Sequence, residues 1–295
     1  MTSVGISLGT LNPKAWREVA LVADEVGIES VFVSDHLVAP ALLAGKLGIG
    51  DETERMQPQT PLIDSISYLC YLAGITERVR LGTCVYLLGL RHPFVAARGV
   101  ATLDMVSGGR ALFGVGAGWL TSEWIAAGIP PQRRGARLDE SIDVCRRLWT
   151  EELVEHRGDF YRFGPVGFAP KPVQRDGVPV LVGGHSAAAL RRAALRGDGW
   201  IGMRQTPREA AERIAVLRRL RTEAGSDRPF TITVGGNVRS AGDLAGWQDL
   251  GVDRVVVRPW SSSRTAATEL REFATSVLPT GPCRNDDASK PDLCG

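Results

Sequence analysis

The sequence has little of what marks a membrane, nucleic-acid-binding or disulfide-rich protein. No apolar run approaches the roughly 18 residues that a membrane span needs. The first residues lack both the basic region and the long apolar stretch of a secretory signal. The formal net charge of +2 gives no excess that would favour nucleic acid or an anionic surface. We therefore expect a cytoplasmic protein without a membrane or nucleic-acid partner.

Cysteine and histidine are also scarce. The five cysteines lack C-x-x-C spacing, which argues against a disulfide framework and against a zinc site. Cys70, Cys84 and Cys145 lie in apolar periodic segments, where they are expected to pack as small core residues. Cys283 and Cys294 lie in a polar segment and could pair under oxidation. The four histidines include no pair at metal-ligand spacing, so we predict no metal site.

What the sequence does have is a strand–helix pattern that repeats about eight times. The expected strands are residues 4–9, 30–33, 79–88, 110–115, 178–182, 199–203, 231–234 and 254–257. The expected helices are residues 13–27, 62–75, 93–106, 137–150, 187–196, 207–224, 241–250 and 266–277. Continuous apolar strands that alternate with helices imply a parallel sheet covered by helices. The predicted fold class is α/β, a (β/α)8 TIM barrel.

The spacing of these units is uneven. The gap between the fourth and fifth strands is the longest, which predicts an insertion there. Residues 153–157 and 160–163 within it predict a β-hairpin. Residues 37–61 form a long glycine-containing loop, a candidate lid on the ligand side. We expect a single domain over residues 1–278 and a disordered polar tail over residues 279–295.

Histidines follow three of the predicted strands. His36, His92 and His185 each come just after a strand, on the side where a barrel binds its ligands. Any one of them is as readily a packing residue as a functional one. Three at the same end of the barrel favour a functional site.

Two glycine-rich segments also follow strands. Gly183-Gly184-His185-Ser186 precedes a helix, an arrangement that suits a phosphate, although a tight turn that needs positive φ explains it equally well. Residues 114–118 lack the G-x-G-x-x-G spacing of a dinucleotide-binding fold. Their glycines nevertheless allow a flat ligand to lie close to the backbone.

Together these segments resemble the bacterial luciferase-like superfamily, specifically its F420 (deazaflavin)-dependent oxidoreductases of actinobacterial type. The resemblance covers residues 4–278. It rests on residues 34–36, 81–85, 91–93, 101–110, 114–119 with Glu123, 179–186 and 197–200. It implies a cofactor ring at the C-terminal end of the barrel and a cis peptide bond between Cys84 and Val85. One departure is Trp119, which stands where the sugar-phosphate dehydrogenase branch carries glutamate, so that activity is not implied.

The resemblance also assigns site residues. Asp35 and His36 match positions that contact the deazaflavin ring and the substrate. The cofactor-binding candidates are Thr83, Cys84, Val85, Gly116, Ala117, Gly118, Trp119, Gly183, Gly184, His185 and Ser186.

These residues predict an F420-dependent oxidoreductase that acts on a small organic substrate. The reaction would reduce a C=C, C=N or C=O bond, or oxidise an alcohol. His36 is the expected proton donor or acceptor, and Asp35 would orient either His36 or the cofactor. The alternative is an FMN-dependent luciferase-like monooxygenase on the same fold. A homodimer is left open.

Overall fold

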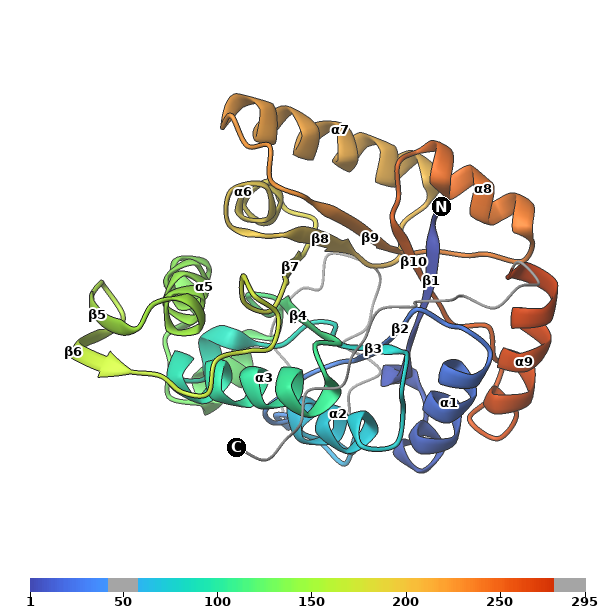
Figure 1. Ribbon diagram of the computed structural model, residues 1–295, viewed down its shortest axis with the longest axis horizontal. Helices are drawn as coiled ribbons and strands as arrows, with labels where there is room; N and C mark the ends of the chain where they lie inside the picture. The colour runs from blue at the N-terminus through green and yellow to red at the C-terminus, as the bar shows by residue number, and fades with distance from the viewer. Residues whose placement is uncertain (42–57, 279–295) are drawn as a thin grey trace.

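The computed structural model describes residues 1–41 and 58–278. In these residues, eight parallel strands close into a barrel with the ring order β1-β10-β9-β8-β7-β4-β3-β2 (Figure 1). The barrel strands are β1 (Ser3–Ser7), β2 (Ser30–Val33), β3 (Arg80–Thr83), β4 (Ala111–Val115), β7 (Val180–Gly183), β8 (Gly199–Gly202), β9 (Thr231–Gly235) and β10 (Arg254–Val257). The predicted (β/α)8 barrel is confirmed.

Helices surround the strands on the outside of the barrel (Figure 1). They are α1 (Pro13–Glu25), α2 (Ser65–Ala73), α3 (Pro93–Ser107), α4 (Thr121–Ala126), α5 (Arg134–Thr150), α6 (Ala187–Arg196), α7 (Pro207–Glu223), α8 (Ala241–Asp249) and α9 (Ala266–Val277). Helices α1, α3 and α7 each begin with proline. The N–H that proline lacks would have no hydrogen-bond partner within the helix at this position, so no helical bond is lost. Helix α4, a single short segment, was not predicted.

The strand predicted over residues 79–88 is wrong beyond Thr83. β3 pairs Gly82 with Leu112, but the next pair along the two chains is Tyr86 with Val115, which leaves one extra residue on the β3 side. This is a β-bulge, the kind of irregularity that redirects side chains beside a site. The apolar run continues through the bulge, so the apolar pattern alone shows one long strand, whereas the family resemblance implies the cis bond at Cys84–Val85.

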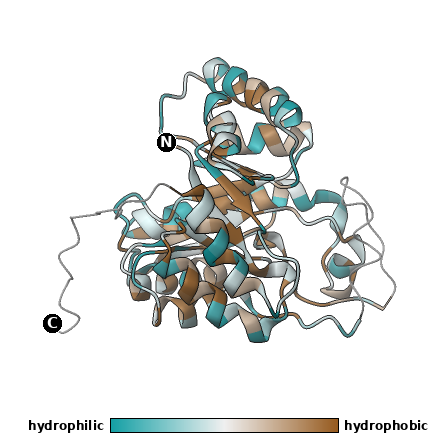
Figure 2. Ribbon diagram, turned by 90° about the vertical axis from the view of Figure 1, so that its right-hand side faces the viewer, coloured by the Kyte–Doolittle hydropathy of each residue, from teal (hydrophilic) through white to brown (hydrophobic). Residues whose placement is uncertain are grey.

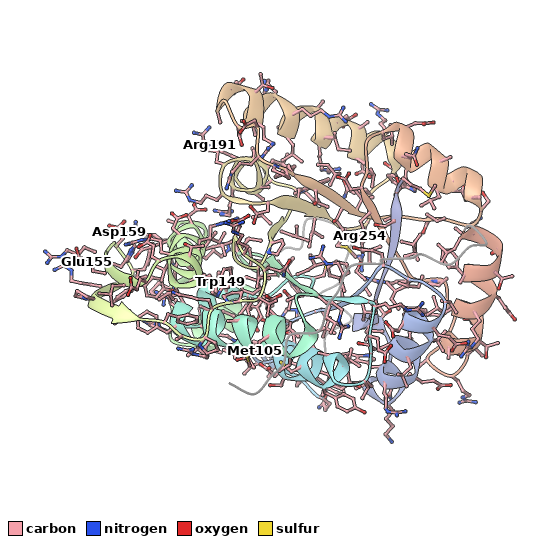
Figure 3. All side chains as sticks on the ribbon, viewed as in Figure 1. Met105, Trp149, Glu155, Asp159, Arg191 and Arg254 are labelled. Carbon is pink, nitrogen blue, oxygen red and sulfur yellow. The ribbon has the colours of Figure 1, made fainter. Side chains whose placement is uncertain are left out.

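The segment between β4 and β7 contains a small sheet outside the barrel. Strands β5 (Leu153–Arg157) and β6 (Arg162–Gly167) pair antiparallel. The second strand begins later than predicted, because the amides of Phe160 and Tyr161 donate to the Glu140 carboxylate instead of to a strand partner. Figure 3 shows the side chains of Glu155 and Asp159 at the outer end of this sheet, away from the barrel strands.

The barrel interior is filled with side chains, so the barrel is not an open pore. Its cluster consists of buried residues from β2, β4, β7, β8 and β10: Phe32, Leu112, Leu181, Ile201 and Val256. Figure 2 shows the strands as the most apolar part of the ribbon, with polar residues on the outer helices. Arg254 (labelled in Figure 3), at the start of β10, forms a partly buried ion pair at 2.6 Å with Glu29, which precedes β2, at the N-terminal end of the barrel.

No helix in the two described segments is long and apolar enough to cross a membrane. Residues 42–57 of the candidate lid lie outside the described residues, as does the tail with Cys283 and Cys294.

Candidate functional site

The three histidines all follow C-terminal ends of parallel strands, as predicted: His36 after β2, His92 after β3 and His185 after β7. The ring of His92 packs against Phe94 and Tyr161, with centroids 4.6 and 5.2 Å away. Its Nδ1 atom accepts a hydrogen bond from the Phe94 amide and caps α3. His92 therefore joins α3 to the segment between β4 and β7.

The ring of His36 contacts the buried carboxylate of Glu123, which lies in α4, after β4. Its Nδ1 atom lies 2.9 Å from Oε2 of Glu123, whose side chain is 1% exposed. The other Glu123 oxygen accepts hydrogen bonds from the amides of Leu37 and Val38. The edge of the His36 ring faces Trp119, 6.1 Å between centroids. The ring itself is 17% exposed, so a ligand at the barrel mouth can reach it.

Asp35 is held by different partners. Both of its oxygens bind the Arg91 guanidinium, and Oδ2 also accepts from the Leu87 amide at 2.9 Å. Burial raises the pKa of Asp35, while Arg91 and the Leu87 amide act to lower it. The Nδ1 atom of His36 bonds to Glu123 and not to Asp35, and the role of Asp35 in orienting His36 or the cofactor stays a prediction.

The β-bulge after β3 presents Val85 to two glycines. The Cys84–Val85 peptide bond is cis, as the resemblance implied. A Cβ atom added at Gly116 would lie 2.5 Å from Val85 Cγ2, and one added at Gly183 would lie 2.6 Å from Val85 Cγ1. Val85 thus fits against the bare backbones of β7 and of the loop after β4. A larger residue at either position would have to displace the Val85 side chain.

Cys84 and Thr83 border the same bulge. Burial raises the pKa of the Cys84 thiol to about 12, so it stays protonated at neutral pH. Cys84 packs with Val85 and Met203 on the apolar cluster inside the barrel. The Thr83 hydroxyl is fully buried and donates to the Gly114 carbonyl at 2.7 Å.

The loop after β4 carries three more of the candidates. Gly118 has a φ of +72°, and its carbonyl accepts from the Arg134 side chain at 3.3 Å. Ala117 and Trp119, on either side, are half-buried. This loop leads directly into α4 and Glu123.

The loop after β7 has the geometry of a backbone turn into a helix. Gly184 has a φ of +123°, which side chains rarely adopt, and Ser186 caps α6 by accepting from the Ala189 amide. The His185 ring lies 3.2 Å from the Gln205 amide nitrogen and edge-on to Trp200. Burial lowers the pKa of His185, and nearby Arg213 adds to this effect. The imidazole is therefore neutral at neutral pH and belongs to the contact between the loops after β7 and β8.

Two residues of this site were not among the predicted ones: Glu123 and Arg91. Both stand in the quoted sequence motifs, but nothing local shows that Glu123 reaches His36 or that Arg91 reaches Asp35. In the described segments, no group of histidine, cysteine and carboxylate side chains could hold a metal ion.

The sequence model of luciferase-like monooxygenases matches residues 2–249 of the chain. The chain belongs to this family. The resemblance noted in the sequence is thereby confirmed, and with it the assignment of the chain as an oxidoreductase. All of the segments discussed above as a site lie within the matched range.

Relatives and neighbours of this luciferase-like protein differ in what is known of them. An uncharacterised protein of Mycobacterium tuberculosis is 34% identical over 265 residues, covering 88% of this chain and 92% of that protein. An F420-dependent glucose-6-phosphate dehydrogenase of Nakamurella multipartita is 35% identical over 193 residues, covering 64% of this chain and only 52% of that enzyme. The crystal structure of the monooxygenase RslO1 from Streptomyces bottropensis shares the fold, with a TM-score of 0.74, 24% identity and coverage of 94% and 99%.

Proposed function

We propose that the protein is an F420-dependent oxidoreductase that transfers hydride between the deazaflavin and a small organic substrate. The observation that carries the proposal is the half-buried, apolar Cys84–Val85 bulge after β3, at the same end of the barrel as the partly exposed ring of His36. The 35% identity to an F420-dependent dehydrogenase supports the choice of cofactor.

The residues present fit such a cofactor. Cys84 and Val85 are half-buried and apolar, and they offer an uncharged support for a ring. The start of α6, which follows the positive-φ Gly184, offers backbone N–H groups for a phosphate. The bound cofactor would supply the hydride chemistry that protein side chains lack.

His36 is the proposed proton carrier of the reaction. Glu123 occupies one of its ring nitrogens, while the ring remains partly exposed at the mouth. In alcohol oxidation, the imidazole would take the proton of the substrate hydroxyl. In reduction of a C=C, C=N or C=O bond, it returns a proton to the partner atom. Asp35, enclosed by Arg91 and the Leu87 amide, holds the neighbouring backbone in place.

A second candidate is an FMN-dependent monooxygenase. The family that the chain belongs to is that of the luciferase-like monooxygenases, which favours this alternative. The monooxygenase RslO1 also has the same fold. The same support at Val85 would accept a flavin ring.

Absorbance titrations of the purified protein with F420 and with FMN distinguish the two. We expect F420 to bind more tightly than FMN, NAD or NADP. Tighter binding of FMN would favour the monooxygenase, and binding of neither cofactor would refute both proposals.

A further inference from the structure

We propose that Glu123 is a positioning residue that fixes the tautomer of His36. Its carboxylate keeps the neutral imidazole protonated at Nδ1, so that Nε2 is the atom that exchanges a proton with the ligand. The role given to Nε2 rests on the proposed function, whereas the tautomer does not.

The contacts of Glu123 leave one consistent arrangement of hydrogens. Oε1 accepts from the amides of Leu37 and Val38, at 2.5 and 3.3 Å, and Oε2 lies 2.9 Å from His36 Nδ1. An ionised carboxylate can only accept hydrogen bonds, and its three partners here can all donate. Nδ1 must then carry a hydrogen, which leaves the lone pair of the neutral ring on Nε2.

Glu123 also fixes the backbone that carries the ring. It projects from α4, after β4, and binds two successive amides of the segment that follows β2. The side chain is 1% exposed, so water cannot readily replace these contacts. A flip of the His36 ring would lose the bond to Nδ1 and leave a buried carboxylate oxygen without its donor, which is costly. Ring orientation and protonation site are thus set by one carboxylate.

The molecule contains a second histidine–glutamate pair that serves as an internal comparison. Glu140 Oε1 lies 3.0 Å from Nε2 of His156, and the Glu140 carboxylate also accepts from the amides of Phe160 and Tyr161. Here the bonded nitrogen is Nε2, so the same reasoning gives the opposite tautomer. This pair lies at the β5–β6 sheet, outside the barrel ring.

The substitution Glu123→Gln should reverse the tautomer of His36. The Leu37 and Val38 amides require an acceptor, so the side-chain carbonyl oxygen of the glutamine replaces Oε1 of Glu123 as their partner. The glutamine NH₂ group then faces Nδ1 and can only donate. Nδ1 becomes the acceptor, and the ring proton moves to Nε2.

The test is ¹H–¹⁵N NMR of the histidine rings in protein labelled with ¹⁵N-histidine, which is tractable because the chain has four histidines. His36 is assigned from the signal lost in His36→Asn. At a pH where the ring is neutral, we expect the Nδ1–H pattern in the wild type and the Nε2–H pattern in Glu123→Gln. The matched control, Glu140→Gln, should alter only the His156 signals.

Two outcomes would overturn the inference: an Nε2–H pattern for wild-type His36, or an unchanged His36 spectrum in a folded Glu123→Gln variant. If that variant does not fold, the wild-type spectrum alone decides the tautomer. F420 titration of the same samples keeps the two proposals apart. Absence of F420 binding to the wild type would refute the cofactor and the role of Nε2, while the tautomer would stand on the spectrum.

Discussion

Arg91 grips the buried carboxylate of Asp35 at two points, with Nη1–Oδ2 and Nη2–Oδ1 distances of 2.8 and 3.0 Å. The guanidinium also lies over the ring of Tyr86, 4.4 Å from its centroid. Asp35 follows β2, whereas Arg91 and Tyr86 follow β3, so the pair ties together two loops of the barrel mouth. Arg–carboxylate pairs of this two-point form are the most geometrically specific ion pairs.

Removal of Arg91 should therefore be costly. In Arg91→Met, the Asp35 carboxylate loses its charged partner while remaining buried, and breaking such a pair typically costs about 3–5 kcal/mol of stability. Denaturant unfolding measures this loss. The control is Arg147→Met, which removes an exposed two-point contact to Glu151 and should cost at most about 1 kcal/mol. Equal losses in the two variants would contradict the structural importance of Arg91.

Gly183→Ala should displace Val85. The added methyl would lie 2.6 Å from Val85 Cγ1, and such overpacking costs about 1–3 kcal/mol. Val85→Ala removes the obstruction, so the double variant should be more stable than the sum of the single effects predicts. Unfolding free energies of the three variants measure the coupling, with Gly164→Ala, where nothing lies within 4 Å of the new methyl, as control. Additive effects would show that Val85 does not press on Gly183.

Gly184→Asp should weaken F420 binding at least tenfold, because it adds bulk and negative charge to the proposed phosphate loop. Absorbance titration gives the dissociation constant. Gly225→Asp is the control for backbone strain, since Gly225 also has positive φ (+61°) but follows α7, where nothing lies within 4 Å. Unchanged affinity in a folded Gly184→Asp protein would remove this loop from the site.

His36→Ala should reduce turnover about 100- to 10,000-fold, the usual contribution of a positioned acid–base group. The measurement is the F420 absorbance change at saturating cofactor, with a substrate found by screening alcohols and unsaturated carbonyl compounds. If His36 only packs beneath the cofactor, the variant will bind F420 weakly yet turn over within a few-fold of the wild type when saturated.

His185 should contribute a pH dependence to stability. Its pKa is lowered by burial and by Arg213, so below about pH 6.5 the unfolded chain takes up this proton before the folded protein does. Stability is then lost as the pH falls. The unfolding free energy of each protein is measured from pH 8 to pH 5. Between about pH 6.5 and 5, it should fall less steeply in His185→Asn than in the wild type. An equally steep decline in the variant would assign the effect to other groups.

The sequence predicts the barrel well because its strands are local apolar runs. Strands β2 and β10 have the predicted boundaries, and α9 begins and ends where its apolar periodicity does. The bulge at Val85 could not be predicted in this way. Its side chain fits against Gly116 and Gly183, which belong to other strand–helix units.

The site shows the same division. The positions of His36 and His185 at the mouth follow from the strand pattern. Their partners do not, because Glu123 is 87 residues from His36 and belongs to a helix too short for a periodic signal. Arg91, which bonds to Asp35, is likewise 56 residues away from it in the sequence. These long-range polar contacts form only when the barrel is closed, so they cannot be predicted from the local sequence of any one strand.

The pairing of β1 with β10 has a consequence for how the chain is made. The Ser3 amide donates to the Asp253 carbonyl at 2.9 Å, across 250 residues of sequence. During synthesis, β1 therefore keeps one unpaired edge until almost the whole domain has emerged, and such edges invite pairing with other chains. Closure this distant also slows folding. A chain that stops before Arg254 would have two open edges, at β1 and β9, and should aggregate during expression.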